Sequence, residues 1–65
     1  SRAWYYAEVL KNARKSAGIT QQQLADKIGK KREYVAMLEK GETDMQLSTF
    51  IMISEAVGLK FALTY

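Results

Sequence analysis

Apolar positions in this chain recur at helical spacing in four segments, and a glycine follows each segment. In the first segment, Tyr6, Val9, Leu10 and Ala13 are spaced i, i+3, i+4 and i+7, which is typical of one buried stripe on a helix. A glycine just past such a stripe is the usual left-handed end of a helix. The chain is therefore expected to form helices over residues 3–16, 21–28, 31–40 and 47–57.

The second segment has a clear start signal. Thr20 precedes it and Gln23 follows three residues later, so the two form a Thr-x-x-Gln capping box. The start of the fourth segment is less marked, and either Asp44 or Gln46 serves as its N-cap. The side chains expected to face the core in the last three helices are Leu24, Ala25, Ile28, Val35, Leu38, Leu47, Phe50, Ile51, Ile53 and Val57.

The pattern changes to period two after Gly58. Leu59, Phe61, Leu63 and Tyr65 alternate with other residues and fall on one face, which predicts a β-strand over residues 59–65. A lone strand leaves its backbone N–H and C=O groups without partners. The simplest partner is the same strand of a second copy, which gives a two-stranded ribbon in a twofold dimer. The alternative is a frayed tail or an extra cover for the core.

Composition excludes most enzyme chemistry. The 65 residues make one small domain and include no Cys and no His, so disulfides, a zinc site and the commonest catalytic base and thiol nucleophile are all missing. We expect no enzyme activity, no cofactor and no metal. No apolar run reaches the roughly 20 residues of a membrane span. Stability is expected from helix packing, from a partner chain, or from both.

Charge is unevenly distributed along the chain. Residues 1–32 hold eight basic and two acidic side chains, a net charge of +6, whereas residues 33–65 hold two basic and five acidic ones, a net charge of −3. Four of the basic side chains lie within the six residues from Lys27 to Arg32. Such a basic cluster suits a polyanionic partner. The alternative is a solvated helix face and its loop.

The two central helices are joined by a short turn at Gly29 and Lys30, and two short helices joined in this way are typical of a helix-turn-helix over about residues 20–40. Residues 20–29 resemble the first half of the phage-repressor/Cro (XRE) type helix-turn-helix. Residues 34–41 resemble the recognition helix of that family, and residues 47–59 its next helix. The resemblance covers about residues 9–59 and implies an all-α, lambda-repressor-like DNA-binding domain of four to five short helices.

The C-terminal part is most similar to the HipB-type antitoxins of that family. Residues 47–50, followed by the alternating residues 59–63, carry this similarity. It implies a ribbon of paired C-terminal strands in a homodimer, binding to an operator in double-stranded DNA, and a toxin as protein partner.

Three residues of the third helix are candidate base readers. Arg32 can form two hydrogen bonds to guanine, and Glu33 can accept one from cytosine. Met37, one turn beyond Glu33, can contact a thymine methyl group. The alternative for Glu33 is an intrahelical partner for a lysine, or a charge that the helix dipole favours.

A second group is expected to contact phosphate. The resemblance assigns a phosphate contact to Gln21 at the start of the second helix, where its amide N–H and the backbone N–H groups can donate. Lys31 stands where the family usually has Ser or Thr, and lysine cannot accept a capping hydrogen bond. For Tyr34 the alternative is packing, and for Lys40 it is a favourable position at a helix C-terminus. The full group is Gln21, Gln22, Lys30, Lys31, Tyr34 and Lys40.

Two further features are expected to be structural. Arg14 and Glu39 match an ion pair of the family that joins the first helix to the end of the third. Trp4, Tyr5 and Tyr6 form an aromatic cluster before the motif, and we expect it to pack in the core or at an interface.

These observations predict a cytoplasmic transcriptional repressor that binds a near-palindromic operator as a dimer and also acts as the antitoxin of a toxin-antitoxin pair. The alternative is a protein-binding module that neutralises a toxin or enzyme, with DNA binding secondary. Salt separates the two hypotheses, because binding to phosphates falls steeply as salt rises.

Overall fold

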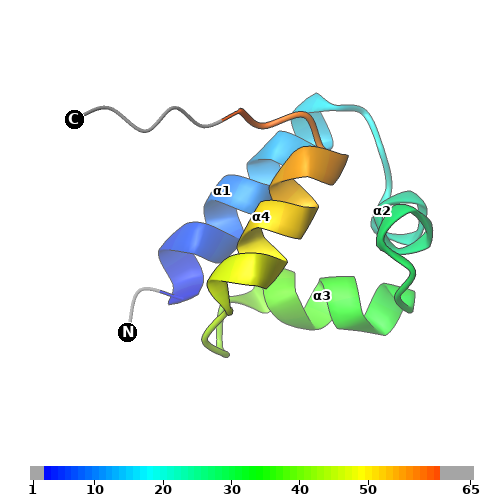
Figure 1. The fold of residues 1–65 in the computed structure, drawn as a ribbon. Coiled ribbons are helices and arrows are strands. Elements are labelled where there is room, and N and C mark those ends of the chain that lie inside the picture. Colours follow the sequence, from blue (N-terminus) through cyan, green and yellow to red (C-terminus); the bar gives the residue numbers. More distant parts are fainter. Residues whose placement is uncertain (1–2, 61–65) are drawn as a thin grey trace.

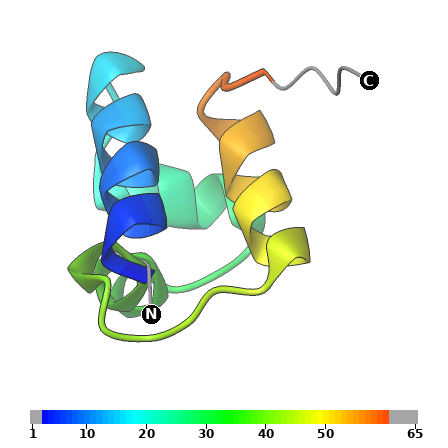
Figure 2. The same cartoon turned by 90° about the vertical axis from the view of Figure 1, so that its left-hand side faces the viewer.

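The computed structural model describes residues 3–60, which form four helices (Figure 1). They are α1 (Ala3–Ser16), α2 (Gln21–Ile28), α3 (Arg32–Lys40) and α4 (Leu47–Ala56). α1 and α4 lie side by side and run in the same direction (Figures 1 and 2), and α2 and α3 pack against each other. α1 contacts α3 and α4, and α2 contacts the same two helices. Within residues 3–60, no helix has the length and apolar character to cross a membrane.

The predicted bounds of α1 and α2 are confirmed, and those of α3 and α4 are each wrong by one residue. α3 begins at Arg32 because the backbone of Lys31 is extended, with φ −84° and ψ 154°, and Lys31 is the N-cap. α4 ends at Ala56, and Val57 is its C-cap. Gln46 is the N-cap of α4, without a hydrogen bond from its side chain.

The predicted capping box at the start of α2 is confirmed. The backbone N–H of Gln23 donates to the Thr20 hydroxyl at 3.0 Å, and the Thr20 backbone N–H donates to Gln23 Oε1 at 2.8 Å. At the other end of α2, Gly29 is left-handed, with φ 70°, and the next backbone N–H, of Lys30, donates to the carbonyl of Ala25 at 2.9 Å. Both ends of α2 are therefore fixed by local sequence, which sets the direction in which the chain enters the turn before α3.

One hydrophobic core joins all four helices. Most of the predicted inward positions of α2, α3 and α4 are buried, and Ile28 and Phe50 pack partly buried against them. Burial of this kind supplies most of the stability of a domain without disulfides. The buried cluster consists of Leu10, Leu24, Ala25, Val35, Leu38, Ile53 and Val57.

The buried stripe of α1 differs from the prediction. Tyr6 is 46% exposed, and the buried positions of the helix are Ala3, Ala7, Leu10 and Arg14. The stripe is rotated because two small alanines let α1 approach its neighbours, and because Arg14 is buried by an ion pair that apolar periodicity does not register.

The predicted inward face of α4 is also partly wrong. Leu47 is 72% exposed and Ile51 is 41% exposed, whereas Ser54 is completely buried. The Ser54 hydroxyl donates to the carbonyl of Phe50 at 2.6 Å, so burial leaves no unsatisfied polar group there. α4 therefore turns large apolar side chains to the outside and a small polar one to the inside.

The predicted C-terminal strand lies mostly outside the described residues, which include Leu59 and Lys60 but not Phe61, Leu63 or Tyr65. The described part of the chain contains no strand. Leu59 donates its backbone N–H to the carbonyl of Ser54 at 2.9 Å, and its side chain packs partly buried against the core. For Leu59, these contacts fit the alternative prediction, in which the C-terminal segment covers the core, better than they fit a β-strand.

Candidate nucleic-acid interface

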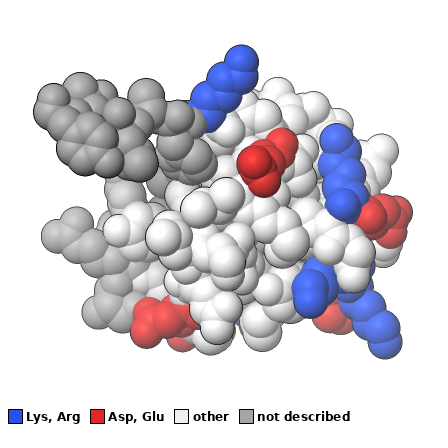
Figure 3. All heavy atoms as spheres, in the orientation of Figure 1, with Lys and Arg blue, Asp and Glu red and all other residues white. Residues whose placement is uncertain are grey.

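α2, the turn at residues 29–31 and α3 form the helix-turn-helix that the sequence predicts. α2 packs directly on α3, and Leu24 and Ala25 of α2 are buried with Val35 and Leu38 of α3. The turn leaves its lysines exposed, and basic side chains gather on the side of the molecule where α2 and α3 lie (Figure 3).

The outer side of α3 forms a shallow groove. The three candidate base readers Arg32, Glu33 and Met37 all line this groove. The Arg32 side chain is 47% exposed, the Glu33 side chain 76% and Met37 42%. Ala36 and Glu42 line the same groove and were not singled out from the sequence. The signal for Ala36 is its spacing, four residues after Arg32, which puts both on one helix face.

Arg32 contacts two neighbours. Its Nη1 donates to Gln21 Oε1 at 3.1 Å, and its Nη2 lies 3.9 Å from Glu33 Oε2. The contact with Gln21 is a hydrogen bond across the turn from α3 to the start of α2, whereas the separation from Glu33 leaves only a weak, exposed ion pair. Arg32 therefore has a defined direction while much of its side chain stays accessible.

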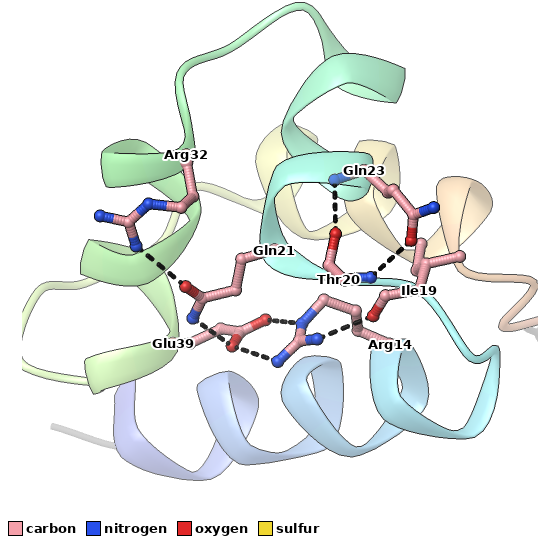
Figure 4. A network of polar contacts seen from close by, with 7 residues as sticks. All are labelled: Arg14, Ile19, Thr20, Gln21, Gln23, Arg32 and Glu39. Atoms are coloured by element: carbon pink, nitrogen blue, oxygen red, sulfur yellow. Dashed lines mark hydrogen bonds and ion pairs between the residues drawn. The ribbon is translucent and has the colours of Figure 1, made fainter.

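Gln21 connects Arg32 to the interior of the protein (Figure 4). Its Nε2 donates to Glu39 Oε1 at 3.0 Å, while its Oε1 accepts from Arg32. A carboxylate can only accept and a guanidinium can only donate, so the amide has one possible orientation between them. One side-chain N–H of Gln21 thus donates to Glu39, and the second N–H of the amide is left for the phosphate contact that the sequence predicts.

Glu39 and Arg14 form a nearly buried ion pair between α3 and α1 (Figure 4). Arg14 Nε donates to Glu39 Oε2 at 2.6 Å, and Arg14 Nη2 donates to Glu39 Oε1 at 3.0 Å. Arg14 Nη1 donates to the carbonyl of Ile19 at 2.8 Å, in the loop before α2. The guanidinium therefore ties together α1, that loop and α3, which are the segments that hold the helix-turn-helix in position.

Both charges of this pair are stabilised. Burial raises the pKa of Glu39, but hydrogen bonds from Arg14 and Gln21 and the nearby positive charges outweigh this effect, so the pKa lies below its ordinary value. The hydrogen bond to Glu39 raises the pKa of Arg14 above its ordinary value, against the effect of burial. Glu39 is thus held as a carboxylate at neutral pH.

The candidate phosphate-binding side chains differ in their exposure and in their contacts within the protein, and one of them, Lys40, lines the groove. Lys30, Lys31 and Lys40 are exposed, and the Lys30 ammonium lies 5.2 Å from the centre of the Tyr34 ring. Tyr34 is partly buried and packs against the core, which is the packing alternative of its prediction. Gln22 donates from Nε2 to Asp26 Oδ1 at 3.0 Å on the exposed side of α2.

The groups on this surface are guanidinium, ammonium, amide, carboxylate and thioether. Among the residues that the structure describes, no group of three or more Asp, Glu, His or Cys side chains comes together in a way that could hold a metal ion. Guanidinium and ammonium groups match phosphate oxygens, and the guanidinium and carboxylate also match the donors and acceptors of base edges in the major groove.

Comparison with known families agrees with this geometry. A family model described as Helix-turn-helix matches residues 10–63, which is most of the chain and includes all of α2, the turn and α3. No curated protein and no solved structure matches the chain. The matched domain type binds DNA, and α3 is the second helix of its helix-turn-helix, the helix that motifs of this type place in the major groove.

Proposed function

The chain belongs to the XRE-type helix-turn-helix family of DNA-binding regulators, and from this membership we propose that it is a sequence-specific transcriptional repressor. The observation that carries the proposal is the groove along α3, in which Arg32, Glu33 and Met37 lie together next to the basic turn. A recognition helix needs exposed, chemically different side chains on one face so that it can distinguish base pairs.

We assign base recognition to three side chains. Arg32 binds guanine O6 and N7 through two parallel hydrogen bonds, and Glu33 accepts a hydrogen bond from the amino group of cytosine. Met37 contacts a thymine methyl group. The hydrogen bond that Arg32 donates to Gln21 supports the role of Arg32, because it restricts the guanidinium before DNA arrives and reduces the entropy lost on binding.

The remaining cationic and polar groups bind the DNA backbone. Lys30 and Lys31 precede α3, and Lys40 lies at its C-terminal end, so they flank the groove along the helix. Their exposure supports contacts to phosphate, which add affinity without sequence information. Gln21, Gln22 and Tyr34 complete this group. The hydrogen bonds of Gln21 and Gln22 within the protein each use one N–H of the side-chain amide, so the second N–H of each, the Gln21 backbone N–H and the Tyr34 hydroxyl are the groups suited to phosphate.

We further propose that the repressor binds a near-palindromic operator as a homodimer, with two α3 helices about 34 Å apart in successive turns of the major groove. The alternating Phe61, Leu63 and Tyr65 support pairing of the C-terminal segments of two copies. The likeness of residues 47–50 and 59–63 to HipB-type antitoxins supports a toxin as a second partner.

A second candidate function is a module that neutralises a toxin or enzyme, with DNA binding secondary. The observation that favours it is the set of exposed aromatic side chains on α1, of which Trp4 is 64% exposed. Salt separates the two functions. Binding to DNA phosphates falls linearly in a log–log plot as salt rises, whereas an apolar protein interface responds little.

The deciding experiment is selection of duplexes from a random library at about physiological salt. We expect an inverted repeat of two half-sites. Arg32→Ala should then cost about 1–3 kcal/mol and relax the preference at one base pair, whereas Lys30→Ala should weaken all sequences alike and lower the salt dependence. Recovery of no motif, or an equal loss on every sequence for both variants, would contradict base recognition by Arg32.

A further inference from the structure

Large apolar side chains form an exposed surface at the N-terminal ends of α1 and α4, which we call the aromatic face. Leu47 is 72% exposed and Trp4 64%, and Tyr5, Tyr6 and Ile51 are each between 41% and 50% exposed. Single exposed apolar residues are ordinary on protein surfaces, but a contiguous group of this size marks an interaction site.

The three aromatic members of this face contact one another in a row that continues to Phe50 of α4. Successive ring centres lie 6.0 Å apart from Trp4 to Tyr5, 5.5 Å from Tyr5 to Tyr6, and 5.7 Å from Tyr6 to Phe50, each pair in an edge-to-face arrangement. Beside them, Tyr6, Leu47, Phe50 and Met45 line an open hollow of about 280 Å³. The rings thus form one continuous row from α1 to α4, which ends at a hollow wide enough to take side chains of a partner.

The five residues of the aromatic face are neutral: Trp4, Tyr5, Tyr6, Leu47 and Ile51. The exposed Glu8 borders them on α1, one helical turn after Trp4, and the surface over α4 in Figure 3 is mostly uncharged. In a twofold dimer the same patch meets itself, so any charge on it would face a like charge. A neutral face rich in Tyr and Trp has the composition of an interface core and meets this condition.

The chain beyond Lys60 matches the same surface. Residues 61–65 read Phe-Ala-Leu-Thr-Tyr, with no charge and with large apolar side chains at every second position. A second copy therefore brings to the contact both an uncharged face and an uncharged, apolar end. The small size of the chain adds to this argument, because a domain of 65 residues without disulfides gains much from covering such a surface.

The aromatic face also borders the recognition helix. At Gly41, which follows α3 directly, an added Cβ would lie 2.6 Å from the Cα of Trp4. A copy docked on the aromatic face therefore sits near the C-terminal end of α3, while Arg32 at the N-terminal end of α3 stays free. The N-terminal residues of a recognition helix are those that contact base edges, so this arrangement keeps both copies able to read DNA.

We propose that the aromatic face is the surface on which a second copy of this chain docks. This inference deepens the proposed function and rests on it, because a repressor that binds an inverted repeat needs two copies of α3. It assigns the main contact to Trp4, Tyr6 and Leu47 on two helices rather than to the C-terminal segment alone.

The test is the oligomeric state of the full chain, measured by sedimentation over a range of concentrations. Trp4 is the only tryptophan of the chain, so its emission reports on the proposed contact directly. Emission should shift to the blue as the concentration rises and the dimer forms. Leu47→Glu should raise the dimer dissociation constant at least about tenfold, as for loss of an interface anchor, and keep the emission that of an exposed ring.

The matched control is Ser48→Glu, which adds the same charge to the same first turn of α4 at an exposed position that, unlike Leu47, does not line the hollow beside Tyr6 and Phe50. It should leave the dimer unchanged. A carboxylate near a helix N-terminus favours the helix, so both variants should fold, and circular dichroism verifies this. Ile51→Lys is a second disruptive variant if Leu47→Glu melts early.

Three results would overturn the proposal. One is a wild-type chain that stays monomeric at all concentrations, which would leave the aromatic face to a different protein. Another is a dimer that survives both Leu47→Glu and Ile51→Lys. The third is a dimer that Leu63→Glu abolishes and Leu47→Glu leaves intact, because the C-terminal segment would then make the contact alone.

The outcome is separable from that of the proposed function. A dimer that depends on Leu47 but selects no motif from a duplex library would leave this inference standing and remove the repressor function. A monomeric chain that selects a single half-site would do the opposite. Dimer loss in Leu47→Glu should also convert selection of an inverted repeat into selection of one half-site.

Discussion

Replacement of Glu39 by alanine is the sharpest test of how the helix-turn-helix is held in position. The Glu39 and Arg14 side chains are 7% and 10% exposed, so the variant leaves a guanidinium buried with only the carbonyl of Ile19 as its partner. Removal of one member of a buried ion pair costs about 3–5 kcal/mol. Because the pair here keeps slight access to water, we expect the lower end, about 3 kcal/mol.

That loss is large for a chain of this size. At about 0.05–0.15 kcal/mol per residue, 65 residues have a total stability of about 3–10 kcal/mol. In a domain of this length, 1 kcal/mol shifts Tm by about 4–8 °C, so Glu39→Ala should lower Tm by about 12–24 °C. Thermal and urea unfolding followed by circular dichroism measure both quantities.

The matched control is Glu55→Ala, which removes an exposed carboxylate from α4 and should change Tm little. A double variant, Arg14→Met with Glu39→Leu, should recover most of the lost stability, because apolar residues of similar size replace a buried ion pair at little cost. A Tm for Glu39→Ala equal to that of Glu55→Ala would refute the reasoning, since the pair would then contribute no more than a surface contact.

Three further predictions test other parts of the structure. Because the pKa of Glu39 is lowered in the folded state, its charge contributes to stability above about pH 4.5, and this contribution is lost as the pH falls through the pKa of the folded state. The urea midpoint of the wild type should therefore fall more steeply in acid than that of Glu39→Gln. Gly41→Ala should lower Tm more than Gly29→Ala, because both glycines have positive φ but only at Gly41 does an added Cβ meet backbone, 2.6 Å from the Cα of Trp4. Thr20→Ala should cost about 1 kcal/mol in urea unfolding, through loss of the capping box of α2.

Local signals in the sequence were sufficient for the helix-turn-helix. The bounds of α2 follow from Thr20, Gln23 and Gly29, which act through hydrogen bonds and backbone angles within a few residues. The core of α2 and α3 follows from helical periodicity for the same reason. The candidate base readers share one groove because helix geometry alone determines which residues lie on one face.

Orientation between helices was not predictable in this way. Tyr6, Leu47 and Ile51 have the hydrophobicity of core residues, yet they are exposed, whereas the small side chains of Ala7 on α1 and Ser54 on α4 are buried. A pattern of apolar residues records which side chains favour burial, but small residues decide how closely two helices approach. An exposed group of apolar residues is typical of a surface that another chain covers. The periodicity of a sequence does not distinguish apolar residues buried in the core from apolar residues buried by a partner.

The least predictable feature is the chain of hydrogen bonds that links Arg14 of α1 to Arg32 at the start of α3. The resemblance pairs Arg14 with Glu39 and assigns Gln21 to phosphate, but periodicity and spacing do not reveal that Glu39 also accepts from Gln21, or that Gln21 in turn accepts from Arg32. Each of these contacts joins residues at least 11 positions apart, so each depends on the finished fold. The consequence is that the direction of Arg32 is set by an ion pair that also holds α1 to α3. Stability and the proposed base recognition by Arg32 therefore share one set of hydrogen bonds, and we expect a substitution at Glu39 to act on both.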